Sequence, residues 1–477
     1  MEESSYDDQQ FWGELEAIVS VQSNNYEEID DCLRTFIDTA ACSDQEYCLS
    51  EYDLARCCYG LLESRLFQEN KDYVRRQFVF GLLQEDDARV LHVMAAVLLH
   101  DGRSDEVAFE MMQAEGAFTQ LIGLIRAGKD DDTGLHRLLV SLLGEMSRIQ
   151  RLSWADLANV DDAFIMYLFQ LIEELSNDAN DPYHYPTIRV LLVLNEQYMC
   201  HAAGPPKADG TPANTLTNRI IKVLSNHGPD FRTFGENLIL LLNRESALGP
   251  QLLILKLLYL LFTTPPTYEY FYTNDLHVLV DVIIRNLLDL DPGPYGDEET
   301  DTHGEGGGQR ALRHTYLRVL FPLLKNTQLA RDEGHYKKEE LRKLLHLLVH
   351  GSSMHFAPAD ETVVRLVTRC RQVEWIREEE DDPVDIHARS SLTSPPSDAE
   401  VAKRLLGMNL AEAGESNLSI LDVTAKVEKE KPMVPAPRRR GKKLQQEHDA
   451  LLKPSSNPPS NHDYSGGRSP FDDDNNE

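Results

Sequence analysis

Residues 272–290 carry apolar side chains at the spacing of one buried helical face, recurring at i, i+3, i+4 and i+7 and onward. They are Leu276, Leu279, Val280, Ile283, Ile284, Leu287 and Leu288. The charged residues on the opposite face are Asp281, Arg285 and Asp289. Asn274 stands where its side chain is expected to cap the first turn, and Asp291-Pro292 ends the run. The segment therefore predicts an amphipathic helix packed against other helices.

Helical periodicity continues from about residue 10 to about residue 375, and no segment alternates convincingly with period two. Candidate helices lie near 10–20, 26–40, 51–66, 70–82, 86–100, 105–127, 133–149, 161–176 and 186–201. Short connections predict an all-α, armadillo/HEAT-like helical solenoid. No repeat of fixed period is visible, so any repeats have diverged. Segments 189–194 and 251–262 are apolar almost all round, and we expect them inside the array with neighbours on two sides.

Three regions follow from the change in composition along the chain. We expect an N-terminal helical region at 1–184, the tightest helical core at 185–376, and a disordered tail at 377–477. Segments 202–212, 263–267 and 291–308 are rich in Pro or Gly and polar residues, which predicts surface loops. The tail opens with an acidic run and continues with Ser, Pro and Asn, and one short helix is expected near 398–410.

The charge balance excludes some classes of function. The 477 residues include 47 Lys and Arg against 79 Asp and Glu, a formal net charge of −32. Such a chain repels nucleic-acid phosphate and anionic membrane unless a local basic patch intervenes. The longest apolar run, 252–262, is interrupted by Lys256 and is shorter than the ~20 residues that cross a bilayer. We therefore expect no nucleic-acid partner and no membrane span.

The first residues and the cysteines point to a cytoplasmic protein. Residues 1–8 lack the basic stretch and apolar core of a secretory signal. The seven cysteines are an odd set without a Cys-x-x-Cys pair, which favours reduced thiols over a disulfide framework or a metal site.

Five segments of the second half carry a resemblance to a known family. They are 191–199, 250–262, 263–271, 272–290 and 313–324. Over about residues 185–372 the chain resembles the leucine-rich domain of the WISH/DIP family of Arp2/3-complex activators, and its long acidic loops and tail resemble those of a filamentous-fungal member. The resemblance makes region 185–376 a leucine-rich, armadillo-like domain.

The resemblance implies a function that composition alone does not indicate. The domain is expected to dock on the Arp2/3 complex and favour its active arrangement without a pre-existing filament. Unbranched filaments would then start and seed branched networks at endocytic cortical actin patches. The implied partners are the Arp2/3 complex and, through it, actin. The alternative is a helical-repeat scaffold that links SH3-domain and endocytic proteins without activating actin assembly.

No motif in the sequence predicts catalysis. A phosphate-binding loop, a His-Glu-x-x-His pair and a Gly-x-Ser-x-Gly elbow are all missing. The glycines at 304–308 sit in an acidic loop, where a phosphate would be repelled. His346 and His350 lie one helical turn apart without a third ligand, which favours a surface or packed pair over a metal site. We expect no enzyme, no catalytic or metal-binding residue and no cofactor.

Several charged residues on the predicted helices are candidates for partner docking. Arg310, His314 and Arg318 recur at i, i+4 and i+8, and Arg365 and Arg369 are a second pair. Two interpretations stay open for these stripes: neutralisation by the acidic loop or nearby carboxylates, and docking on an acidic partner face. The remaining candidates are Arg285 and Glu196. The neighbouring Asn195 is better explained as a buried amide than as a partner contact.

The tail contains a pattern that SH3 domains recognise. Lys429 is followed at the required spacing by Pro432 and Pro435, and then by Pro437 and Arg438 in a basic cluster. A polyproline II segment presents such prolines to an aromatic groove at little entropic cost. We expect SH3-domain proteins as tail partners, while the basic cluster is equally suited to actin's acidic surface or anionic lipid.

Overall fold

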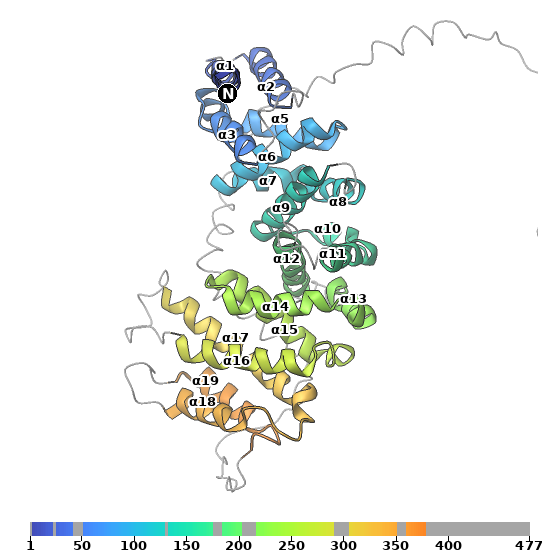
Figure 1. Cartoon of the computed structure of the whole chain (residues 1–477), viewed down its shortest axis with the longest axis vertical. Coiled ribbons are helices and arrows are strands. Elements are labelled where there is room, and N and C mark those ends of the chain that lie inside the picture. Colours follow the sequence, from blue (N-terminus) through green and yellow to red (C-terminus); the bar gives the residue numbers. More distant parts are fainter. Residues whose placement is uncertain are drawn as a thin grey trace, which may run out of the picture. The chain divides into compact units, whose positions relative to one another are not determined.

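The computed structural model describes residues 2–21, 25–41, 51–128, 132–174, 184–202, 216–290, 305–350 and 359–377. Within these ranges the chain forms nineteen α-helices and three 3-10 helices, and none of the described residues is in a strand (Figure 1). The all-α prediction is confirmed. The predicted tail beyond residue 377, with its short helix near 398–410, lies outside the described residues, and so do most of loops 202–212 and 291–308.

The first nine helices lie close to the predicted boundaries, except that α1 starts at Glu2 where the sequence predicts a start near residue 10. They are α1 Glu2–Val19, α2 Tyr26–Ala41, α3 Glu51–Leu62, α4 Arg65–Glu69, α5 Lys71–Gln84, α6 Ala88–Ser104, α7 Val107–Ala114, α8 Ala117–Ala127 and α9 Thr133–Ile149. Two predicted helices are each divided in two. Gly116 adopts a left-handed φ of 80° and separates α7 from α8. The Ser64 hydroxyl accepts a hydrogen bond from the Phe67 N–H and starts α4.

The remaining helices complete the array. They are α10 Trp154–Asn159, α11 Asp162–Glu174, α12 His184–Ala202, α13 Arg219–His227, α14 Arg232–Arg244, α15 Leu248–Thr263, α16 Thr273–Asp289, α17 Glu305–Asn326, α18 Lys338–His350 and α19 Glu361–Arg371. The 3-10 helices are η2 Gly228–Asp230, η3 Pro265–Thr267 and η4 Gln328–Ala330. The predicted loop at 263–267 is thus largely the 3-10 turn η3.

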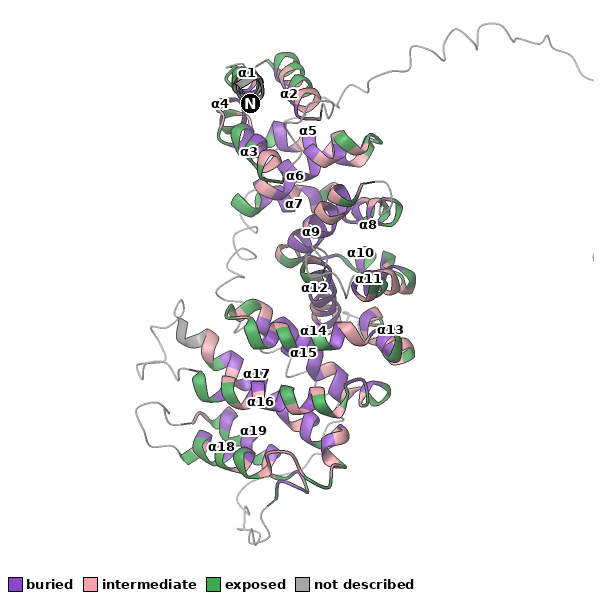
Figure 2. Cartoon of the chain, in the orientation of Figure 1, coloured by how far each residue is buried: buried purple, intermediate pink, exposed green. Residues whose placement is uncertain are grey.

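Six helices pack in succession and form the inner layer of the array. Each of α6, α9, α12, α15, α17 and α19 contacts the next one in this order. Other helices pack against these six, as α11 does on α12, and α14, α16 and α18 contact one another in turn. In α15 eleven residues are buried, from Gln251 to Phe262 with only Leu260 left out (Figure 2). The prediction that segments 189–194 and 251–262 lie inside is confirmed, although Arg189 itself is half-buried.

Helix α16 shows where periodicity succeeds and where it fails. Five of the seven predicted core residues are buried: Leu276, Leu279, Val280, Ile283 and Leu287. Leu288 is 43% exposed, and Val282 is buried in its place. The predicted cap is wrong, because the helix starts at Thr273 and Asn274 lies inside its first turn. Asp275 instead accepts a hydrogen bond from the Tyr272 N–H at 3.3 Å.

The five described cysteines form no disulfide with one another: Cys57, Cys58 and Cys370 are buried, and Cys32 and Cys200 are half-buried. Burial raises the pKa of the Cys200 thiol to about 11, and the nearby Glu196 carboxylate acts in the same direction. None of the described helices combines the length and the apolar content that a membrane span requires. Within the described residues, no three His, Cys, Asp or Glu side chains are grouped as metal ligands.

Candidate docking surface

Helix α17 concentrates positive charge in an acidic chain. Its residues 309–326 include four basic residues and no acidic one: Arg310, Arg313, Arg318 and Lys325. Helix α19 packs along α17 and adds Arg365 and Arg369, one helical turn apart. The packing of these two helices therefore brings together the two cationic stripes that the sequence predicts separately.

The start of α19 is fixed on α17 through Asp360. Its Oδ1 accepts a hydrogen bond from the Val363 N–H at 2.7 Å and caps the helix. Its Oδ2 accepts one from His314 Nε2 at 2.7 Å and one from Arg310 Nε at 3.1 Å. Burial alone would raise the pKa of Asp360, but the hydrogen bonds from His314, the Val363 N–H and Arg310 outweigh it and hold the pKa below its ordinary value. The carboxylate thus stays ionised and holds both the His314 and the Arg310 side chains.

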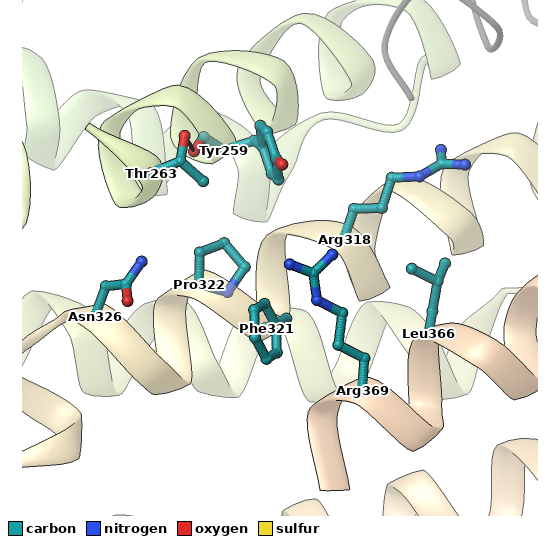
Figure 3. A pocket seen from close by; sticks show the side chains of 8 residues that line it. All are labelled: Tyr259, Thr263, Arg318, Phe321, Pro322, Asn326, Leu366 and Arg369. Carbon is teal, nitrogen blue, oxygen red and sulfur yellow. Dashed lines mark hydrogen bonds between the residues drawn. The ribbon is translucent and has the colours of Figure 1, made fainter. Parts of the chain in front are cut away.

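A pocket lies between α15, α17 and α19, and we call it the arginine pocket. Its lining residues are Tyr259, Thr263, Arg318, Phe321, Pro322, Asn326, Leu366 and Arg369. Figure 3 shows Arg369 extending from α19 toward α17, while the Arg318 side chain extends from α17 in a different direction, and Tyr259 and Thr263 lie on α15 across from Phe321 and Pro322.

The Phe321 ring of the arginine pocket lies close to two cations. The Arg369 guanidinium lies 4.1 Å from the centroid of the Phe321 ring, and Lys325 Nζ lies 5.4 Å from the same ring. Arg318 is buried, with 8% of its surface exposed. Guanidinium groups beside an aromatic ring bind carboxylates and aromatic side chains well, because the cation is planar and weakly hydrated. The pocket is therefore suited to an acidic segment of protein.

Two predicted docking residues, Arg365 and Arg285, do not line the arginine pocket itself. Arg365 is exposed on α19, one turn before Arg369, and so extends the cationic surface of the arginine pocket. Arg285 is exposed on α16, where its Nη2 donates a hydrogen bond to Asn243 Oδ1 of α14 at 2.6 Å. The structure therefore separates Arg285 from the α17–α19 group.

Glu196 and Asn195 both make contacts within the inner layer. The Glu196 carboxylate forms an ion pair with Lys256 of α15, and the Lys256 side chain is 9% exposed. Asn195 is fully buried, and its Oδ1 accepts a hydrogen bond from Asn218 Nδ2 at 2.8 Å. The buried-amide interpretation of Asn195 is confirmed, with a side chain as its partner in place of the backbone.

Sequence reasoning missed Asp360 and Phe321. Asp360 directly precedes the apolar-periodic run of α19, which is an N-cap signal available in the sequence. Phe321 lies three residues after Arg318 on the same helix, but its partner Arg369 comes from α19, and single-sequence periodicity gives no such pairing.

The rings of His346 and His350 lie 4.7 Å apart. The SH3-type residues Lys429, Pro432, Pro435, Pro437 and Arg438 lie outside the described residues.

Comparison with known proteins shows which family this array is similar to. Residues 180–341 match the SPIN90/Ldb17 leucine-rich domain, and this match includes α12 to α17. The chain is 29% identical over 378 residues to Protein dip1 of Schizosaccharomyces pombe, covering 78% of this chain and 95% of the relative.

Two further relatives are also fungal. Protein LDB17 of Saccharomyces cerevisiae is 29% identical over 426 residues, covering 77% of this chain and 80% of the relative. Protein LDB17 of Eremothecium gossypii is 27% identical over 399 residues, covering 76% and 80%. The predicted resemblance to the WISH/DIP family is confirmed, because residues 180–341 match the SPIN90/Ldb17 leucine-rich domain and the fungal relatives match along most of their length.

Proposed function

We propose that this chain is a non-enzymatic activator of the Arp2/3 complex. It promotes nucleation of unbranched actin filaments without a pre-existing filament, and these filaments seed branched networks at endocytic cortical actin patches in the cytoplasm. The match of residues 180–341 to the SPIN90/Ldb17 leucine-rich domain is the observation that carries the proposal. The three fungal relatives, each matched along more than three quarters of its own length, support it.

The docking surface of this proposal is the cationic face of α17 and α19. It consists of Arg310, Arg318, Arg365 and Arg369 around the arginine pocket. In a chain with a net charge of −32, residues 309–326 of α17, with four basic residues and no acidic one, are a local exception. Such a patch steers an acidic partner face toward one orientation and disfavours others. We place Arg285 and Glu196 outside this surface, because Arg285 donates a hydrogen bond to Asn243 of α14 and Glu196 forms an ion pair with Lys256 of α15.

Activation then requires only a difference in affinity between two states of the Arp2/3 complex. A domain that binds the active arrangement about 100-fold more tightly than the inactive one shifts the equilibrium by about 2.7 kcal/mol. The inner helices are suited to this role, since a rigid surface loses little entropy when it binds. The actin monomers would be recruited by the Arp2/3 complex.

Pyrene-actin polymerisation with purified Arp2/3 complex tests the function. We expect the full-length chain to shorten the lag phase only when the complex is present. If the chain leaves the lag phase unchanged with the complex present, the activator proposal fails, and the scaffold alternative with SH3-domain and endocytic partners takes its place.

A pair of charge reversals tests the docking surface. R365E/R369E reverses two cations of the surface, and R331E reverses one exposed cation that pairs with Glu269 on another part of the array. We expect R365E/R369E to bind immobilised Arp2/3 complex at least tenfold more weakly, and R331E to remain within twofold of wild type. Circular dichroism checks that both variants keep their helical content. Equal binding by R365E/R369E and wild type would exclude this surface.

A further inference from the structure

The last described residues are anchored on α17 and α18. The Trp375 indole N–H donates a hydrogen bond to the Leu324 carbonyl of α17 at 2.9 Å. Arg342 of α18 holds the next residues, since its Nε donates to the Ile376 carbonyl at 2.8 Å and its Nη2 donates to the Arg377 carbonyl. Leu324 lies three residues after Phe321, about one helical turn along α17. Trp375 is therefore held at the C-terminal end of α17, at the carbonyl of the residue that precedes Lys325.

The sequence that follows is strongly acidic. Residues 378–382 read Glu-Glu-Glu-Asp-Asp, five consecutive carboxylates. An extended chain advances about 3.3 Å per residue, so five residues span roughly 16 Å. Arg369 lies in the last turn of α19, six residues before Trp375. The acidic run begins three residues after Trp375, so its length is sufficient to extend back along the end of α17 to Lys325 and the neighbouring cations.

We propose that the acidic run 378–382 docks in cis on Arg369, Lys325 and Arg318, and so occupies the surface that an acidic partner would use. Its competition with a partner rests on the proposed function, whereas the docking itself does not. The short tether gives the run a millimolar effective concentration at the pocket, so ion pairs that are individually weak suffice. Salt screens the contact, and a partner of higher affinity displaces it.

Zero-length cross-linking of the full-length chain tests the docking. A carbodiimide joins the amine of Lys325 to a carboxylate that contacts it, and mass spectrometry of the digest identifies the pair. We expect an intramolecular link from Lys325 to residues 378–382. A link from Lys325 to 297–299 or to 472–474 in its place, or no link at all, would overturn the proposal.

A substitution in the pocket distinguishes docking of the acidic run from simple proximity of the run to Lys325. R369Q removes one cation of the pocket and leaves Lys325 and the tether unchanged, so we expect the yield of the link to fall at least threefold. R331Q removes an equal charge elsewhere and is expected to leave the yield unchanged. If R369Q and R331Q give the wild-type yield, the run lies near the pocket without docking, and the proposal is wrong.

Two matched triple variants test whether the acidic run competes with a partner for the pocket. E378Q/E379Q/E380Q and D472N/D473N/D474N each remove three carboxylates from the tail. We expect the first to bind Arp2/3 complex about fivefold more tightly than wild type, and the second to bind like wild type. If the link forms while neither variant changes affinity, the competition is excluded. If no variant binds the complex at all, the proposed function fails while the docking in cis stands.

Discussion

His314 of α17 donates a hydrogen bond to Asp360 across 2.7 Å, and Asp360 is also the residue that caps α19. The Asp360 carboxylate therefore caps the first turn of α19 and also anchors that end of the helix on α17. Arg310 donates to the same oxygen of Asp360. The position of α19 relative to the basic residues of α17 therefore depends on Asp360, and α17 and α19 both line the arginine pocket.

Removing the Asp360 carboxylate should destabilise the array. D360A removes the cap of α19, which contributes about 0.5–2 kcal/mol, and leaves the buried His314 without its acceptor. We expect the free energy of unfolding in urea to fall by about 2–4 kcal/mol. D289A at the exposed end of α16 is the control, with an expected change within about 0.5 kcal/mol. Equal effects of the two substitutions would contradict this role of Asp360.

The depressed pKa of Asp360 gives a pH dependence of defined sign. A carboxyl whose pKa is lower in the folded state than in the unfolded state stabilises the fold above its unfolded pKa. That stabilisation is lost as the pH falls through the folded-state value. The difference in unfolding free energy between wild type and D360N should therefore narrow between about pH 5 and about pH 2.5. A difference that widens on acidification would show that Asp360 is not held ionised.

Two glycines on helices should respond to alanine in opposite directions. A Cβ at Gly102 of α6 would lie 2.3 Å from the buried Phe109 ring, so we expect G102A to cost about 1–3 kcal/mol. A Cβ at Gly123 of α8 would meet no atom within 4 Å, and G123A should stabilise the chain by about 0.5–1 kcal/mol. Thermal unfolding of the two variants gives the comparison. A stabilised G102A would show that α6 and α7 are packed less closely than described.

The ion pair between Glu196 and Lys256 should be coupled energetically. K256M leaves a partly buried carboxylate without its cation, at an expected cost of about 1–3 kcal/mol. The double variant E196Q/K256M should recover part of this loss, because it removes the uncompensated charge as well. A double-mutant cycle in urea measures the coupling. Additive effects of the two substitutions would indicate that the pair contributes no net interaction between α12 and α15.

The sequence predicts most helices of this protein because the buried face of each helix requires apolar residues at helical spacing, and this spacing is visible in a single sequence. Segment 251–262 is apolar all round, and it forms the most completely buried helix, α15. Short-range backbone chemistry was harder to anticipate. Gly116 divides one predicted helix, and the α16 N-terminus uses Asp275 where Asn274 was expected. Such choices depend on φ values and hydrogen bonds that a hydrophobic pattern does not record.

The candidate site was predictable only in part, for a related reason. The stripes on α17 and α19 are visible as i, i+4 spacings within each helix. Their meeting at Asp360 and Phe321 depends on how the two helices pack, across a separation of 46 residues between His314 and Asp360. The Glu196 and Lys256 pair is likewise made between helices, 60 residues apart. Charge spacing within one helix gives no information about such partners.

The most direct test of the account is to image single actin filaments grown from monomers with purified Arp2/3 complex and the full-length chain, without added seeds. The account predicts that new filaments start unbranched, in numbers that rise with the concentration of the chain. It also predicts that R365E/R369E reduces those numbers at least tenfold while R331E does not. If the filaments are no more numerous than with the complex alone, the proposal that this chain activates the Arp2/3 complex is contradicted.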